Sequence, residues 1–555
     1  MHPRHAIRIV AFATLILFTF LVWRQYEPHT YLHGDGAFYA NINKSIWNDG
    51  TIDQTNYHPH SWLEDDLGWN RDLDQGWSNV SLGRDGRWMP KHSYILPLFS
   101  TPFYALFGLT GLLFFQVLMM TTLVVVSYAI ASQWVSPLAA AIATGIVAAQ
   151  PVITGDLYAY NNDAFISALL AVAAWTFARQ RIIASGLLFG IAVAAKATNT
   201  LFVLPFAMWL MWSGNKAEIL RGTIAFLVPV MMWLASNALF YGGPFTTSYS
   251  NILVRADGEL TTEGIERQFQ EPFGDGMHRI LTHERQGIIP QAPLLLLAIL
   301  GALWMLTDQQ QRAFGAVYLA ILALFLGLHA KYAYTYGRFF LPVVGLSVLP
   351  LGIFLSRTTQ LFDQLAPTRN GAANPWFFAI GILTLIGATV VTLQVNPRST
   401  ADWSAVDAIT TAQVTNGQQA CDYFNNLHQK FECHRDKPYQ QWGMALGNEC
   451  VFDDEPQRML WLHPPSRGRR KITFTIPDSV ARLRLRYGLS QVSRYSDITF
   501  QVRLGDERIT LPSVTEKAKI YVHDVDIPQN QRELTIQVDG EQTGWRHFCL
   551  DAESR

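Results

Sequence analysis

A succession of apolar segments separated by polar loops most limits how this chain of 555 residues can fold. A helix that crosses a membrane needs about 20 mostly apolar residues, and roughly eleven segments near that length precede residue 397. We expect the spans at residues 6–23, 108–131, 136–153, 163–178, 182–197, 199–213, 219–241, 290–306, 312–329, 338–356 and 376–395. Residues 93–107 are expected to form a short surface helix leading into the second span. The chain is therefore predicted to be a polytopic α-helical membrane protein.

The first apolar segment also has features of a secretory signal peptide, because Arg4 and Arg8 flank its start. A signal peptide ends in a cleavage site of small residues. Here residues 22–26 read Val-Trp-Arg-Gln-Tyr, which are bulky. We therefore interpret the segment as a retained first helix.

Basic residues in the short loops predict the orientation, since cytoplasmic loops are enriched in lysine and arginine. With a cytoplasmic N-terminus, the inner loops carry Arg4, Arg8, Arg179, Arg181, Lys216, Arg221, Arg312, Arg357 and Arg369. The outer side then holds the loops 24–92, 154–162, 242–289 and 330–337 together with the C-terminal region.

Residues 397–555 have a different pattern from residues 1–396 and are expected to form a separate domain outside the membrane. Short runs alternate apolar and polar residues, with Gly, Pro, Asp and Asn between them, which is typical of an antiparallel β-sandwich. The runs are residues 471–476, 481–487, 498–504, 519–522 and 533–538.

All four cysteines, Cys421, Cys433, Cys450 and Cys549, belong to this domain. An even number confined to one polar domain indicates disulfides formed in an oxidising compartment. Four cysteines allow three pairings, and buried free thiols are the alternative. No CxxC spacing occurs, so the sequence does not favour a zinc site.

Asp35 is the strongest candidate for a catalytic residue in the long outer loop 24–92. It lies about a dozen residues beyond the first span, within the run His-Gly-Asp-Gly-Ala-Phe-Tyr at 33–39. Flanking glycines let the backbone approach a ligand closely. A carboxylate in a partly apolar cleft can keep a raised pKa and act as a general base. Most other acids of this loop are expected to be ordinary solvated carboxylates.

Further polar residues recur where the chain meets the same membrane face. Lys91 is suited to pairing with a phosphate, although it could equally extend to lipid headgroups. Asp163 begins a span, so helix capping competes with a role in a polar cavity. Lys196 ends the fifth span and Arg338 begins the tenth, where a guanidinium could bind phosphate through two hydrogen bonds.

Several classes of function receive no support from the sequence. His58 and His60 form an H-x-H pair without an evident third ligand, so a divalent metal is not supported. No P-loop, GxSxG, HExxH or glycine-rich dinucleotide turn occurs. A formal net charge of −1 lacks the basic footprint of nucleic-acid binding.

Together these residues resemble the C superfamily of glycosyltransferases (GT-C), in the branch of protein O-mannosyltransferases and lipid A aminoarabinose transferases. The resemblance covers about residues 1–395. Its motifs are Gly34-Asp35-Gly36-Ala37-Phe38-Tyr39, Pro90-Lys91-His92 with Pro97, Gly186 and Gly190 with Lys196 and Pro205, Asn237 with Tyr241-Gly242-Gly243-Pro244 and Ser248-Tyr249, and Gly337-Arg338 with Pro342. Many relatives have two adjacent acids in the first loop, whereas Gly36 follows Asp35 here, which weakens the expectation of a metal.

The resemblance implies an inverting transfer of a sugar from a polyprenyl-phosphate donor to an acceptor hydroxyl on the outer face of the membrane. Asp35 would be the base, and Lys91, Lys196 and Arg338 would hold the donor phosphate. The substrate cavity would include Tyr39, His92, Asp156, Tyr158, Asp163 and Tyr249. The sandwich pattern resembles a carbohydrate-binding module, and a bacterial inner membrane is the expected location.

Two other functions remain open from the sequence. A transporter or flippase of a lipid-linked saccharide would be expected to show inverted repeats and charges near the middle of the membrane. A non-catalytic envelope protein that binds glycans would tolerate replacement of Asp35. The sugar, and whether a glycan, a lipid or a protein accepts it, are not specified by the sequence.

Overall fold

A computed structural model describes residues 3–24, 35–55, 80–157, 159–256, 259–282, 287–332 and 337–365 of the helical region. In the C-terminal region it describes residues 403–554 apart from 407, 410–411, 417–418, 422, 426–429, 433–443, 447–449, 453–454, 458, 463–468, 491–498, 515, 517, 529–530 and 540–547. The predicted span 376–395 and the residues Tyr158, His58 and His60 lie outside the described residues.

Contacts within the chain divide it into two compact units, one mainly helical and one mainly β. Among the described residues the helical unit runs from 3 to 253 and from 262 to 365, and the β unit holds residues 254–261 and those from 403 onward.

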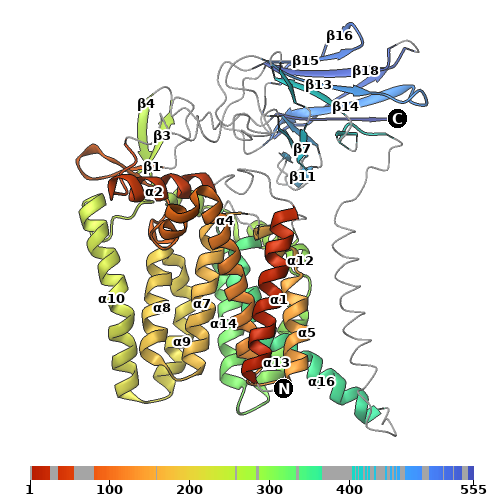
Figure 1. Cartoon of the computed structure of the whole chain (residues 1–555). Helices are drawn as coiled ribbons and strands as arrows, with labels where there is room; N and C mark the ends of the chain where they lie inside the picture. The colour runs from red at the N-terminus through yellow and green to blue at the C-terminus, as the bar shows by residue number, and fades with distance from the viewer. Residues whose placement is uncertain are drawn as a thin grey trace. The chain divides into compact units, whose positions relative to one another are not determined.

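The helical unit is a bundle of upright helices, with α2 (Asp35–Asp49) lying across one end of the bundle (Figure 1). Its helices are α1 (Pro3–Arg24), α2 (Asp35–Asp49), α4 (Ile95–Ala131), α5 (Pro137–Ala148), α6 (Pro151–Asp156), α7 (Asn162–Ala178), α8 (Ile182–Ala195), α9 (Thr200–Trp212), α10 (Lys216–Tyr241), α11 (Phe273–Thr282), α12 (Ile288–Gln291), α13 (Leu295–Leu306), α14 (Arg312–His329), α15 (Leu341–Leu346) and α16 (Val348–Leu365). Short 3₁₀ helices are η3 (Arg84–Gly86), η4 (Ala197–Asn199), η5 (Ile265–Gln268) and η6 (Gly337–Phe340).

Four of the described helices are long and apolar enough to cross a membrane: α1, α4, α10 and α14. A fifth span results if η6–α15 and α16, which meet at a bend of 54°, are counted together. Five shorter apolar helices of 10–17 residues accompany them. The prediction of several membrane-type helices is confirmed, whereas the described residues do not establish the predicted number of eleven.

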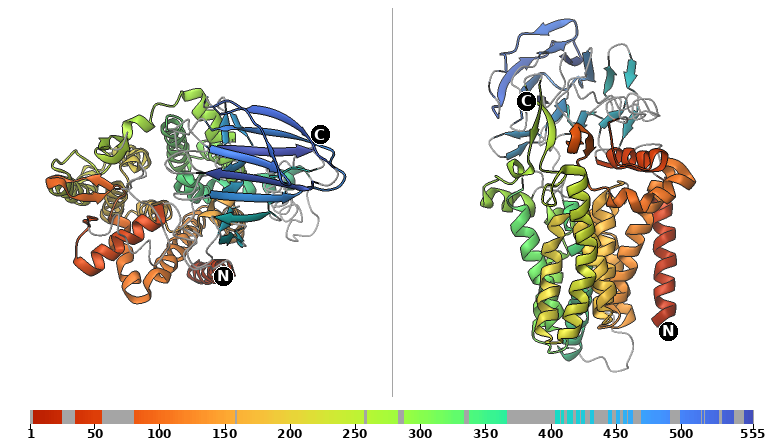
Figure 2. Two further views of the ribbon diagram at one scale, coloured as in Figure 1. Left: turned by 90° about the horizontal axis from the view of Figure 1, so that it is seen from above. Right: turned by 90° about the vertical axis from the view of Figure 1, so that its left-hand side faces the viewer.

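The expected separation of a surface helix from the second span corresponds to a break inside α4. Gly108 has φ 60° and ψ −144°, a combination that only glycine adopts without strain. The segment from Ile95 to Phe107 therefore precedes the break as predicted, and the longer apolar segment follows it. Seen from two directions, α2 lies across the ends of the upright helices (Figures 1 and 2).

Glycines allow α8 and α10 to pack backbone against backbone. A Cβ atom at Gly186 would lie 2.5 Å from the carbonyl oxygen of Gly222, and one at Gly190 would lie 2.4 Å from that of Phe226. Such close approach is how small residues stabilise helix pairs in membranes. Gly186 and Gly190 thus allow α8 to pack tightly against α10. This packing fixes the position of α8, whose C-terminal end is followed by Lys196.

Short strands connect loops that are far apart in the sequence. They are β1 (Val80–Leu82), β2 (Trp88–Pro90), β3 (Ile252–Ala256) and β4 (Glu259–Glu263). β1 pairs antiparallel with β2, and Ser81 in β1 pairs with Ile252 in β3. The Tyr241 hydroxyl at the end of α10 donates to the Pro90 carbonyl at 2.9 Å. These bonds hold the segment that continues into Lys91 and His92.

The β unit consists of two antiparallel sheets, as its alternating sequence predicts. Over the described residues, one sheet has seven strands in the order β17-β14-β19-β12-β9-β8-β7 and the other has six in the order β16-β15-β18-β13-β5-β6. β10 pairs with β11. The strands are β5 (Gln413–Asn416), β6 (Gln419–Cys421), β7 (Tyr423–Asn425), β8 (Lys430–Glu432), β9 (Met444–Leu446), β10 (Cys450–Phe452), β11 (Glu455–Gln457), β12 (Leu460–Leu462), β13 (Arg469–Thr475), β14 (Arg482–Leu489), β15 (Thr499–Leu504), β16 (Glu507–Ile509), β17 (Tyr521–Asp526), β18 (Glu533–Asp539) and β19 (Phe548–Ser554).

Alternate residues of the two sheets share one core. Leu483, Leu485 and Tyr487 of β14 and Ile472 and Phe474 of β13 are buried in it together. This is the period-two burial expected of a sandwich. Cys450 and Cys549 form a disulfide, which confirms the disulfide prediction and selects one bridge from the pairings that the sequence allowed.

Candidate active site

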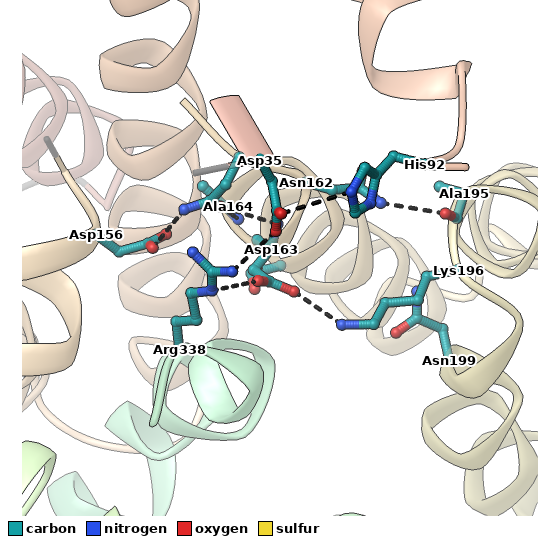
Figure 3. A network of polar contacts seen from close by, with 12 residues as sticks. Asp35, His92, Asp156, Asn162, Asp163, Ala164, Ala195, Lys196, Asn199 and Arg338 are labelled. Carbon is teal, nitrogen blue, oxygen red and sulfur yellow. Dashed lines mark hydrogen bonds and ion pairs between the residues drawn. The ribbon is translucent and has the colours of Figure 1, made fainter. Parts of the chain in front are cut away.

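Asp35 is the first residue of α2, where it meets residues from distant parts of the chain (Figure 3). Its Oδ2 accepts a hydrogen bond from the Arg338 guanidinium at 3.1 Å. Its Oδ1 lies 3.5 Å from His92 Nε2. About a third of the Asp35 side chain, 35%, stays exposed. The carboxylate is therefore held in place yet accessible to a substrate.

Asp163 joins the two basic residues predicted at the ends of separate spans. Its Oδ1 accepts a hydrogen bond from Lys196 Nζ at 3.0 Å, and its Oδ2 lies 3.2 Å from Arg338 Nε. Asp35, Arg338, Asp163 and Lys196 thus form a chain of alternating charges (Figure 3). In this chain Arg338 contacts both carboxylates, each through a different nitrogen.

Helix capping, the competing explanation for Asp163, is wrong. The N-cap of α7 is Asn161, whose side chain accepts hydrogen bonds from the backbone N–H groups of Asp163 and Ala164. Because a neighbouring asparagine satisfies these N–H groups, the Asp163 carboxylate can reach Arg338 and Lys196. Asn162 also donates to the carbonyl of Ala195, at 3.1 Å, and so ties α7 to the residue before Lys196.

Phe339 is a site residue that the sequence analysis missed. The Lys196 ammonium lies 4.2 Å from the centre of its ring, within the range of a cation–π contact. Phe339 immediately follows Arg338 in η6. The pattern Gly-Arg-Phe-Phe shows that an aromatic residue follows the candidate phosphate-binding arginine. It does not indicate that this residue contacts Lys196.

Aromatic residues enclose His92 beside Asp35. The Tyr39 ring centre lies 5.3 Å from that of His92, and the Tyr249 hydroxyl lies 3.5 Å from His92 Nδ1. The structure thus brings Tyr39, His92 and Tyr249 together. Tyr158, predicted to line the same cavity, lies outside the described residues.

The expectation of a raised pKa at Asp35 is wrong. Burial alone would raise this pKa, but the charges of His92, Arg338, Lys91 and Lys196 outweigh burial and hold it at about 2. For His92, burial dominates over the attraction of Asp35 and lowers the pKa to about 4. At neutral pH Asp35 is therefore an anion and His92 is neutral.

The pKa of Asp156, the last residue of α6, is shifted in the opposite direction from that of Asp35. Asp156 is 6% exposed and accepts a hydrogen bond from Asn161 at 2.6 Å. Burial, with help from the Asp163 charge, raises the pKa of Asp156 to about 7, against the opposing effects of Arg338 and Asn161. Below that pH the carboxyl is neutral.

The raised pKa of Asp156 predicts how folding stability depends on pH. Its value in the folded protein, about 7, exceeds the ordinary value of 3.8, so the folded state binds the proton more tightly. Its contribution is complete below about pH 4 and is lost as the pH rises through 7. Asp156→Asn should therefore gain stability over the wild type on going from pH 5 to pH 8.5, by about 2–4 kcal/mol.

Thermal unfolding of both proteins in detergent at the two pH values measures this gain. Asp275→Asn, which removes an exposed carboxyl of α11, controls for the loss of one surface charge. A difference in melting temperature between Asp156→Asn and wild type that does not grow with pH would contradict the prediction.

Charge balance makes the cluster suitable for an anionic ligand. Three cationic side chains, Lys91, Lys196 and Arg338, lie near two acidic side chains, Asp35 and Asp163. A third acid nearby, Asp156, is neutral below about pH 7. A partly exposed excess of positive charge can bind phosphate, and guanidinium groups do so through paired hydrogen bonds. Among the described residues, no group of three or more His, Cys, Asp or Glu side chains could hold a metal ion.

Comparison with known proteins finds a family similarity in the central part of the helical region. A family model described as dolichyl-phosphate-mannose-protein mannosyltransferase matches residues 90–240, the segment that carries Lys91, His92, Asp163 and Lys196. The resemblance to the C superfamily of glycosyltransferases is thereby confirmed over this segment. No curated protein matches the sequence.

Solved structures show distant similarity over a larger part of the chain. ArnT from Cupriavidus metallidurans bound to undecaprenyl phosphate is 13% identical, with a TM-score of 0.43, over 70% of this chain and 71% of that one. The same ArnT in the apo state is 14% identical, with a TM-score of 0.42, over 70% of this chain and 70% of that one. The Archaeoglobus fulgidus oligosaccharyltransferase, tethered to an acceptor peptide with the NVT sequon, is 12% identical, with a TM-score of 0.43, over 72% of this chain and 57% of that one.

Proposed function

We propose that the protein is an inverting glycosyltransferase that moves a sugar from a polyprenyl-phosphate donor to an acceptor hydroxyl at the outer face of the membrane. The observation that carries this proposal is the contact of Arg338 with both Asp35 and Asp163, beside Lys196. A single cluster thereby combines a carboxylate that can accept a proton with cations that can bind a phosphate.

The chemistry is a single displacement. The acceptor oxygen forms a bond to the anomeric carbon while the bond from that carbon to the phosphate oxygen breaks. The acceptor proton passes to the Asp35 carboxylate, and polyprenyl phosphate leaves with the bonding electrons. Arg338, Lys196 and Lys91 stabilise the negative charge that develops on the leaving phosphate. Attack from the face opposite the phosphate inverts the anomeric centre.

Binding of the donor would also make Asp35 a better base. In the described state, positive charge holds the pKa of this carboxyl at about 2, where it is a weak proton acceptor. A phosphate bound to Arg338 and Lys196 would neutralise part of that charge and raise the pKa. Proton transfer would therefore be coupled to occupancy of the donor site.

The remaining residues have supporting roles in this proposal. Asp163 orients the two cations, while Tyr39, His92, Asp156, Tyr158 and Tyr249 line the cavity. We assign catalysis to residues 1–396, and we assign residues 397–555 to a glycan-binding module. A bacterial inner membrane with a cytoplasmic N-terminus is consistent with the basic loops. The Cys450–Cys549 bridge is consistent with a β domain in the periplasm.

Transfer by the purified full-length protein in proteoliposomes tests this function. A panel of radiolabelled polyprenyl-phosphate sugars is offered with lipid, glycan and peptide acceptors, and the product anomer is determined by NMR. We expect transfer from one donor class with an inverted anomeric centre, and none from nucleotide sugars. Passage of an uncleaved lipid-linked saccharide across the bilayer would instead show a transporter.

A further inference from the structure

A buried face of α2 continues inward from Asp35. Asp35, Tyr39 and Asn43 are spaced four residues apart, so they follow one another along one side of the helix. Asp35 contacts His92 and Arg338, and the Tyr39 ring lies 5.3 Å from His92 and 6.2 Å from Tyr160. Asn43 is the innermost of the three and is fully buried.

The Asn43 amide forms hydrogen bonds to the preceding turn of α2, to α4 and to the loop before α7. Its Nδ2 donates to the Tyr160 hydroxyl at 2.8 Å and to the Tyr39 carbonyl at 2.9 Å. Its Oδ1 accepts from the hydroxyls of Ser100 and Thr101, each at 3.0 Å. An asparagine amide has two N–H donors and two acceptor positions, so every hydrogen-bonding position of Asn43 has a partner.

Three of these side chains close a ring of hydrogen bonds. The Tyr160 and Ser100 oxygens are 2.6 Å apart. If Asn43 donates to Tyr160, Tyr160 can donate to Ser100, and Ser100 can donate to Asn43 Oδ1. Each hydroxyl then donates its one proton to the next member of the ring, so all three hydrogen bonds run in the same direction around it. The Leu96 and Pro97 carbonyls, at 3.0 Å and 3.3 Å, are competing acceptors for the Ser100 proton. Buried rings of this kind strengthen cooperatively and tolerate little change of geometry.

The ring joins the segments that carry the candidate catalytic residues. Asn43 belongs to α2, whose first residue is Asp35. Ser100 lies in the first part of α4, shortly after His92. Tyr160 precedes Asp163 at the start of α7. The ring therefore ties together the three segments that carry Asp35, His92 and Asp163. Asp35 contacts His92, and Arg338 links Asp35 to Asp163.

We propose that Asn43 is a positioning residue, which sets the rotation of α2 and thereby the place of Asp35 relative to His92 and Arg338. This inference rests on the proposed role of Asp35 as the base. Asn43 itself acts only through Asp35. Its loss should therefore impair the chemical step and leave recognition of the donor phosphate by Lys196 and Lys91 largely intact.

Asn43→Ala tests the proposal in the full-length protein. We expect kcat for sugar transfer to fall about 10- to 100-fold, since misplacement by an ångström has an effect of that size. The KM for the donor, and the Kd for polyprenyl phosphate measured separately, should change less than about threefold. Tyr160→Phe removes one member of the ring and should lower kcat in the same direction, and the double variant should be little worse than Asn43→Ala, because both changes open one ring.

Asn41→Ala is the matched control. Asn41 is an equally buried amide of α2, 1% exposed, but its Nδ2 donates to Gln54 Oε1 at 2.8 Å rather than to the ring. We expect it to lower the melting temperature comparably while kcat stays within about threefold of wild type. Equal loss of kcat in both variants at equal loss of stability would overturn the proposal, as would a rise in donor KM without a fall in kcat.

The outcomes separate this inference from the proposed function. Absence of transfer by the wild type from every donor would contradict the function itself. Transfer by the wild type that survives Asn43→Ala and Tyr160→Phe unchanged would leave the function standing and remove Asn43 from it. If Asn43→Ala does not fold, Tyr160→Phe against Asn41→Ala decides the question alone.

Discussion

Asp35→Asn is expected to lower the rate of sugar transfer by about 10²- to 10⁴-fold, the range contributed by a positioned general base. The amide keeps the size of the side chain and can still accept a hydrogen bond from Arg338. It cannot take a proton from an acceptor hydroxyl. The loss should therefore appear in kcat, while the Kd for polyprenyl phosphate should stay near the wild-type value or fall, because one negative charge leaves the site.

Asp49→Asn provides the control for this experiment. Asp49 is the last residue of the same helix and is exposed, so the variant makes the identical chemical change away from the cluster. It should transfer sugar at the wild-type rate. Undiminished transfer by a correctly folded Asp35→Asn protein would remove Asp35 from the mechanism and redirect attention to Asp163.

Arg338→Lys is expected to have the second-largest effect, a fall in kcat of about 10²- to 10³-fold, the range found when one donor to a developing anion is removed. Arg338 reaches Asp35 through one nitrogen at 3.1 Å and Asp163 through another at 3.2 Å. A lysine retains the positive charge but lacks the planar fork. It should fail to hold both carboxylates and the phosphate in one arrangement.

Steady-state kinetics with the donor varied measures the effect, and Arg279→Lys is its control. Arg279 bridges Glu271 and the Tyr332 carbonyl, each at 2.9 Å, and its side chain is 26% exposed compared with 27% for Arg338. Arg279→Lys therefore removes a guanidinium with two comparable contacts outside the Asp35 cluster. A similar fall in kcat for both variants would mean that the Arg338 effect is structural.

Local patterns predicted the elements well because apolar periodicity is a local property. The span expected at 312–329 coincides with α14, and the alternating run at 498–504 lies within one residue of β15. The residues proposed for the site were likewise chosen one by one, from a charge or a glycine at the end of an apolar segment.

The connections among these residues could not be predicted from one sequence. Asp35 and Arg338 are 303 positions apart, and nothing local indicates that they meet. The direction of the pKa shift of Asp35 was wrong for the same reason, because it depends on how many cations converge on the carboxylate. Asn43 carried no signal at all, since its role depends on Ser100 and Tyr160.

In the proposed mechanism Asp35 and the donor phosphate share the Arg338 guanidinium, so proton acceptance by Asp35 would depend on the order in which the two substrates bind. While Arg338 remains paired with Asp35, an acceptor hydroxyl or a water molecule meets a poor base. We expect a compulsory order, with the lipid-linked sugar first and the acceptor second, and correspondingly little hydrolysis of the donor. Product-inhibition kinetics report this order directly, and productive binding of the acceptor before the donor would contradict it. The Asp35–Arg338 ion pair would then protect the lipid-linked donor from hydrolysis before the acceptor binds.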